Sequence, residues 1–214
     1  MMRRGVMFSL LFVFVAMAGV QTGSADCRVS EALRTHWART RRMLTNIVAA
    51  MPEDKYDYRP VPEVRSFREM AVHLIQDGIS HTAWISGMSR EEADKLGAKY
   101  DNYKTREEIL RGLGEMFDMG DKFIATITDA NMYDTVVGMR SEPMTRVETA
   151  LVAFEDQMGH YGNMVVYLRI NGVVPPSTAN APQEREENRR RLEEMNLNQP
   201  ATPAAPAVEG EHAH

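Results

Sequence analysis

The chain has only one cysteine, Cys27, among its 214 residues. It therefore forms no internal disulfide, and it is not a small scaffold held together by cross-links. Its stability must come from core packing instead. A hydrophobic content of 43% over this length is sufficient for one globular domain with a sizeable core.

The chain also lacks an excess of positive charge. It carries 25 Lys and Arg against 30 Asp and Glu, a formal net charge of −5. Proteins that bind nucleic acid or anionic membranes usually present a basic surface. The composition therefore predicts no nucleic-acid partner and no membrane association of the folded domain.

Long apolar runs are confined to the first residues. The basic start Met1–Gly5 precedes an apolar run from Val6 to Val20, and the small residues Gly23 and Ala25 follow. This layout predicts a signal peptide over residues 1–25 and an exported protein, periplasmic or extracellular. The run is shorter than the roughly 20 residues of a spanning helix, although an uncleaved anchor is the alternative. Removing the segment leaves 23 basic against 30 acidic residues.

Strand patterns are nearly absent, and Asp134 to Met139, the one strand-like run, is interpreted as a loop packed on helices. Amphipathic spacing predicts long helices over residues 30–51, 66–87, 105–127 and 145–171, with a short one near 90–96. Four of these five begin with a capping box, in which a hydroxyl and a carboxylate satisfy free amide groups reciprocally. The boxes are Ser66–Glu69, Ser89–Glu92, Thr105–Glu108 and Thr145–Glu148. The pattern predicts an all-α, four-helix bundle over residues 26–178.

Residues 179–214 differ in composition and are expected to form a charged, then Pro/Ala-rich tail that is largely disordered. Within it, Gln183 to Asn196 is dense in Glu and Arg and is interpreted as a surface helix without a strong apolar face. His212 and His214 lie in the tail and are assigned no role.

Two histidines and one aspartate in the predicted bundle suggest a metal site. Asp156 and His160 are four residues apart, so they lie on one face of the last helix, beside its apolar stripe. His73 lies on the flank of the second helix, one turn from Asp77. If the two flanks face each other, His73, Asp156 and His160 converge on a divalent metal such as Zn, Fe, Mn or Ni.

Structural roles are the alternative interpretation for the polar residues near this site. His81 falls within the apolar stripe of its helix and is expected to be a core or hydrogen-bonded histidine, and His36 a boundary packing residue. Asp77 either orients the His73 imidazole or is solvated. Tyr167 and Asn163 either contact a substrate or serve in packing. A shared ion requires the imidazole nitrogens of His73 and His160 to lie within about 5 Å.

Several segments of the chain resemble the DinB-like superfamily of four-helix proteins. The resemblance spans about residues 30–178. It rests on the runs Arg59-Pro-Val-Pro-Glu-Val-Arg-Ser-Phe67, His73-Leu74, His160-Tyr-Gly-Asn-Met-Val-Val-Tyr-Leu-Arg169 and Asn171-Gly-Val-Val-Pro-Pro176. It implies an up-down-down-up bundle, a homodimer, and a divalent metal held by three histidines. His73 and His160 match two of those ligands, whereas Asp156 stands where the family usually has histidine.

The resemblance also implies a function. The family is described as metal-dependent hydrolases, and it includes thiol S-transferases that use low-molecular-weight thiols. We therefore expect a divalent-metal-dependent enzyme, hydrolase- or thiol S-transferase-like, acting on a small-molecule substrate. The predicted export argues against the thiol S-transferase hypothesis, because such thiols are chiefly cytoplasmic. The alternative is a non-catalytic, dimeric binding bundle in which the change at Asp156 has left a degenerate metal site.

Overall fold

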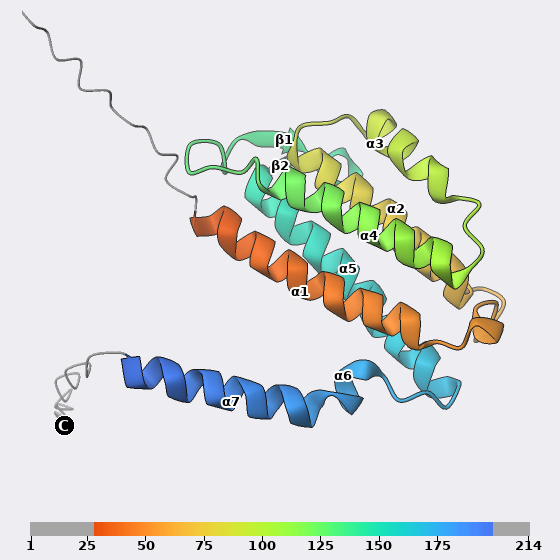
Figure 1. The fold of residues 1–214 in the computed structure, drawn as a ribbon. Coiled ribbons are helices and arrows are strands. Elements are labelled where there is room, and N and C mark those ends of the chain that lie inside the picture. The colour runs from red at the N-terminus through yellow and green to blue at the C-terminus, as the bar shows by residue number, and fades with distance from the viewer. Residues whose placement is uncertain (1–27, 199–214) are drawn as a thin grey trace, which may run out of the picture.

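A computed structural model describes residues 28–198 of the chain, and four long helices form its body (Figure 1). These are α1 (Arg28–Ala50), α2 (Phe67–Ile85), α4 (Arg106–Ile124) and α5 (Arg146–Ile170). The described residues are mostly helical, so the all-α class is confirmed. No helix among residues 28–198 is long and apolar enough to cross a membrane. The predicted signal peptide and the tail beyond residue 198 lie outside the described residues.

Hydrogen bonds and contacts between helices show the direction of each helix. Early in α1, the side chains of Ser30 and Trp37 donate hydrogen bonds to the backbone carbonyls of Ile124 and Phe117, which lie late in α4. These two helices are therefore antiparallel. α2 and α4 are parallel. Gly112 of α4 lies against Ile75, and four residues later Met116 lies against Gly78 of α2, so the contacts advance along both helices together. α2 and α5 are antiparallel, as the bond from Tyr167 to Arg65 and that from Arg146 to Ile85 require. α1 and α5 therefore run one way, and α2 and α4 the other (Figure 1).

The four predicted capping boxes are all formed. In each box the hydroxyl of the capping residue accepts a hydrogen bond from the backbone amide three residues on, and the Glu carboxylate at that position accepts one from the backbone amide of the capping residue. The capping residues are Ser66, Ser89, Thr105 and Thr145. They begin α2, the short α3 (Arg90–Gly97), α4 and α5. The helix starts were predicted to within a residue, because the capping signal is entirely local.

One expectation about the connections was wrong. The segment before α5 is not a plain loop, because β1 (Thr135–Val137) pairs antiparallel with β2 (Pro143–Thr145) in a small hairpin. Arg140 and Ser141, at the turn, have positive φ angles of 56° and 63°. Gly138 packs closely under Met144, since a Cβ at this position would lie 2.5 Å from the Met144 sulfur. The second strand was missed because Thr145 also caps α5, and its helical signal dominates the sequence.

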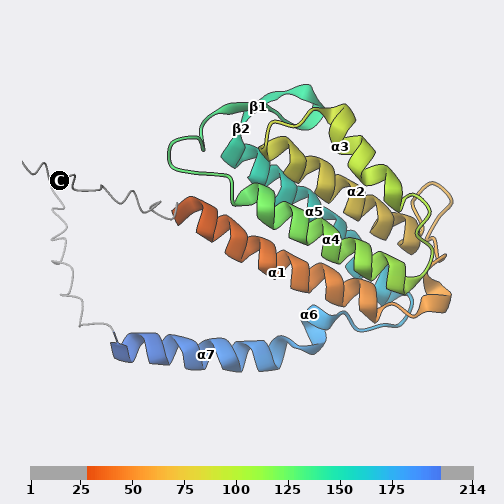
Figure 2. The same cartoon turned by 45° about the horizontal axis from the view of Figure 1, so that its top comes forward.

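The segment after α5 leaves the bundle. Gly172 has a φ of +72° just past the end of α5, and α6 (Pro176–Ala179) then packs on α1. From there α7 (Ala181–Asn198) extends beside α1 without joining the four-helix body (Figure 2). Its side chains are exposed at nearly every position described, which agrees with the predicted surface helix.

Candidate metal centre

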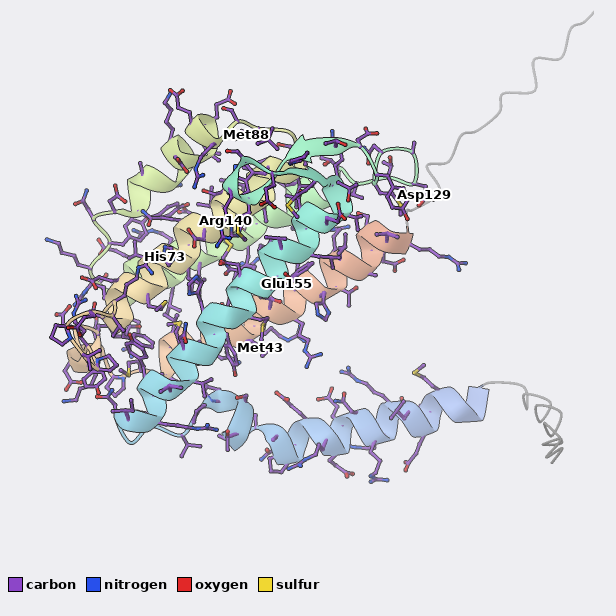
Figure 3. All side chains as sticks on the ribbon, turned by 180° about the vertical axis from the view of Figure 1, so that it is seen from behind. Met43, His73, Met88, Asp129, Arg140 and Glu155 are labelled. Carbon is purple, nitrogen blue, oxygen red and sulfur yellow. The ribbon has the colours of Figure 1, made fainter. Side chains whose placement is uncertain are left out.

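The α2/α5 seam carries the polar side chains on which the site depends. α2 contributes His73, Asp77 and His81, each four residues from the next, so all three lie along one face. α5 contributes Asp156 and His160 with the same spacing. The two rows face each other, since His73 contacts His160 with ring centroids 4.8 Å apart and His81 Nδ1 lies 3.7 Å from Asp156 Oδ2 (His73 is labelled on α2 in Figure 3).

Three of these residues gather their potential ligand atoms in one place. Single ligand atoms of His73, Asp77 and His160 all lie within 4.8 Å of one another. His73 Nε2 is 3.0 Å from Asp77 Oδ2, and His160 Nε2 is 3.7 Å from the same oxygen. Two ligands of one ion are no more than about 4.2 Å apart when each bond is about 2.1 Å. A small adjustment of the rings therefore places the group around a single ion.

The group is partly open to solvent. The side chains of His73, Asp77 and His160 are 23%, 29% and 15% exposed. A ligand set at this depth is shielded on the bundle side, yet it can be reached by a small molecule from outside. Two imidazoles and one carboxylate are a donor set that suits Zn²⁺ and other first-row divalent metals, and it leaves coordination positions free.

Asp156, the predicted third ligand, lies beside this group. Its Oδ1 lies 3.6 Å from His160 Nε2, so it is a neighbour of the group. It does not belong to the three residues whose ligand atoms lie within 4.8 Å of one another. Asp77, which the sequence suggested only as an orienting or solvated residue, holds the place between the two imidazoles. Its spacing of four residues from His73 was the signal that could have found it.

Electrostatics couple Asp77 to both histidines. Burial acts to raise the pKa of Asp77, but the adjacent imidazoles of His160 and His73 outweigh it and hold that pKa far below its usual range. The Asp77 carboxylate in turn raises the pKa of His160, against the opposing effect of burial. Asp77 is thus ionised at neutral pH, which is the form that both a protonated imidazole and a metal cation require.

The remaining candidates lie outside the group of three potential ligands. The Tyr167 hydroxyl donates to the carbonyl of Arg65, and its ring packs edge-on against Tyr58. Asn163 is exposed. His36 is exposed on α1 and contacts the Phe154 ring, with centroids 5.5 Å apart, so it lies at a packing boundary as expected. His81 is buried, as its place in the apolar stripe predicted.

The buried face of α5 has Ala153, Gln157 and Met164 at its centre, whereas Leu151 is 48% exposed. Leu151 instead borders a hollow of about 460 Å³ between α1 and α5. The amide of Gln157 on this face donates to the carbonyl of Leu74, so the face packs on α2. His160 and Asp156 lie in the same seam, beside Asp77 and His81.

Comparisons with known proteins identify the family of the chain. The model of the DinB superfamily matches residues 36–164, which is more than half of the chain. The chain belongs to the DinB superfamily. No curated protein matches it.

Solved structures show the same fold in other members of the superfamily. A DinB-like protein from Bacillus cereus aligns with a TM-score of 0.57 at 13% identity, covering 68% of this chain and 95% of its own. One from Bacillus subtilis aligns with a TM-score of 0.52 at 16% identity, covering 66% and 92%. At these identities the likeness concerns the fold. The site must be argued from the residues of this chain.

Proposed function

We propose that this protein is an exported, divalent-metal-dependent enzyme whose ion is held by His73, Asp77 and His160. The observation that carries the proposal is the convergence of these three side chains from two helices, with all ligand atoms within 4.8 Å. Two neutral imidazoles and an ionised carboxylate would bind a divalent cation with a net charge of +1 at the centre. That charge is partly shielded from water, so it acts more strongly on a bound substrate.

A bound ion of this kind acts as a Lewis acid or lowers the pKa of a coordinated water or thiol. We favour hydrolase-like chemistry over transfer to a thiol, because water is available in every compartment. Asp77 orients the His73 imidazole through the 3.0 Å contact at Nε2 when the ion is absent. When the ion binds, the same carboxylate oxygen lies beside both imidazoles and neutralises part of its charge.

A second candidate function is a binding bundle without catalysis. The observation that favours it is the same Asp77 contact, because His73 Nε2 already has Asp77 Oδ2 as a partner at 3.0 Å without an ion. A site that is stable when empty needs no metal to fold. The two functions differ in whether the purified protein carries metal that depends on these residues.

Elemental analysis tests the proposal. The chain from Asp26 onward is purified without an affinity tag, dialysed and assayed for divalent metals. We expect close to one equivalent in the parent and almost none in His73→Ala and His160→Ala. The matched control is His36→Ala, which removes an exposed histidine of α1 and should retain full metal content. His212→Ala with His214→Ala removes the tail histidines as a further control.

Equal metal in the parent and in His73→Ala, or none in either, would contradict the enzyme proposal. A metal-loaded parent is then assayed on activated esters and phosphate esters. We expect hydrolysis that is lost on chelation and restored when the ion is returned. Full metal loading without turnover on any substrate class would favour the binding bundle instead.

A further inference from the structure

His81 and Asp156 face each other on the inner side of the metal centre. His81 Nδ1 is 3.7 Å from Asp156 Oδ2, and the two side chains are 7% and 21% exposed. Both atoms are fully buried and have no hydrogen-bond partner among the described residues. Buried polar atoms in native proteins are nearly always paired, so two facing atoms left unpaired require an explanation.

The simplest explanation is that the two atoms pair with each other. An N–H···O hydrogen bond spans about 2.7–3.2 Å, so an approach of less than about 1 Å joins them. The His81 ring packs against the Trp84 ring, with centroids 5.0 Å apart, and this contact restricts where the imidazole can turn. A neutral imidazole carries one N–H, and the tautomer with its proton on Nδ1 can donate to Asp156 Oδ2.

The other oxygen of Asp156 faces the opposite way. Its Oδ1 lies 3.6 Å from His160 Nε2, the nitrogen that belongs to the metal-ligand group. This distance is too long for a hydrogen bond, but it suits two neighbouring ligands of one ion. The carboxylate thus lies between an imidazole that could hold it and a position where it could bind a cation.

We propose that His81 is a positioning residue that fixes Asp156, so that Asp156 Oδ1 joins His73, Asp77 and His160 around the ion. His81 donates from Nδ1 to Asp156 Oδ2, which leaves a single oxygen directed at the metal. Carboxylate ligands are commonly held by such an outer partner, and its loss weakens metal affinity about 10–100-fold. The inference rests on the proposed function and assigns His81 a task within it.

Two substitutions at position 81 separate positioning from packing. His81→Leu keeps an apolar side chain beside Trp84 but removes the donor. His81→Asn places an amide nitrogen near the former position of Nδ1, so it keeps the donor while filling less space. Metal dissociation constants are measured by competition with a chromophoric chelator in the full mature chain. We expect His81→Leu to bind metal about 10–100-fold more weakly and His81→Asn to recover most of that loss.

The absorption spectrum of the Co²⁺-substituted protein gives a second readout that a packing role would not move. Loss of the Asp156 ligand should change the band positions and intensities in His81→Leu and in Asp156→Asn alike. In the double variant, which carries both His81→Leu and Asp156→Asn, the loss of metal affinity should barely exceed that of Asp156→Asn alone. The reason is that both substitutions remove the same ligand, the Asp156 carboxylate. His36→Leu, which alters an exposed histidine outside the site, serves as the control.

The possible failures are distinguishable. If the parent binds metal and His81→Leu binds it equally well, the positioning role is wrong and the proposed function stands. If His81→Asn is weakened as much as His81→Leu, the effect is one of packing and the role is again wrong. If the parent binds no metal at all, the proposed function fails and this inference falls with it.

Discussion

The α1/α4 seam and the α2/α5 seam are built from similar helices, yet they treat buried polar atoms differently. At the α1/α4 seam, Trp37 packs on Phe117 with ring centroids 4.7 Å apart, and its Nε1 donates to the Phe117 carbonyl. Ser30 Oγ donates to the Ile124 carbonyl in the same seam. Each of these buried donors has a partner.

At the α2/α5 seam, hydrogen bonding of the buried side chains is less complete. Six buried side-chain atoms lack a hydrogen-bond partner among residues 28–198, and all six belong to α2 or α5. They include His81 Nδ1, Asp156 Oδ2 and His160 Nδ1, which lie at the candidate metal centre. Unpaired buried polar groups reduce stability, so they tend to remain where function requires them. The comparison shows that buried polar atoms without partners are concentrated at the seam that carries the candidate metal centre.

The largest expected effect comes from breaking the α1/α4 seam. Trp37→Ala removes a ring that is 1% exposed, together with its hydrogen bond to Phe117. We expect the free energy of unfolding to fall by about 3–5 kcal/mol, as measured by urea denaturation. Where the variant still folds, its metal affinity should be close to that of the parent. A large loss of affinity in the folded variant would show that the two seams are not independent.

Adding metal should strengthen only the α2/α5 seam. An ion that binds the folded state alone stabilises it by about 2.7 kcal/mol at a concentration 100 times its dissociation constant. We therefore expect metal to raise the melting temperature of the parent. The melting temperature of His160→Ala should not change. An equal rise in both proteins would place the bound ion elsewhere.

Replacing Asp77 should change how stability depends on pH in the metal-free protein. The lowered pKa of Asp77 contributes stability that is present above about pH 3.9, its unfolded value, and is lost as pH falls. The raised pKa of His160 contributes stability that is present below about pH 6.5 and is lost as pH rises through the folded value. Asp77→Asn should therefore destabilise most between these limits.

Melting temperatures of the parent and of Asp77→Asn from pH 3 to 8, in metal-free buffer, measure this difference. Histidine titration by NMR should also show the pKa of His160 lower in the variant than in the parent. A difference in melting temperature that stays constant across the range would mean that the contact is not electrostatic.

The smallest effect is expected at the outer edge of the α1/α4 seam. Arg41 and Asp118 form an ion pair whose side chains are 44% and 63% exposed. Exposed pairs contribute about 0–1 kcal/mol, because water screens the charges. Asp118→Asn should change the free energy of unfolding by no more than that, and metal affinity should not change. A larger loss would indicate that surface charge, rather than Trp37, holds this seam.

Prediction from sequence succeeded where the signal was local. The capping boxes at Ser66, Ser89, Thr105 and Thr145 placed four helix starts, because each box needs only residues three positions apart. The segments around His160 and Gly172 indicated the superfamily, which the match over residues 36–164 confirms. The hairpin Thr135–Thr145 was missed, because its pairing joins two short strands with weak individual patterns.

The sequence by itself determined the helices, their order and the presence of histidines on α2 and α5. Only the tertiary structure decided which carboxylate stands between those histidines. Helical periodicity tells which residues share a face of one helix, but the rotation of that helix against its neighbour depends on packing across the seam. The packing of α5 on α2, which includes the hydrogen bond from Gln157 to Leu74, places Asp77 beside His160 and Asp156 beside His81.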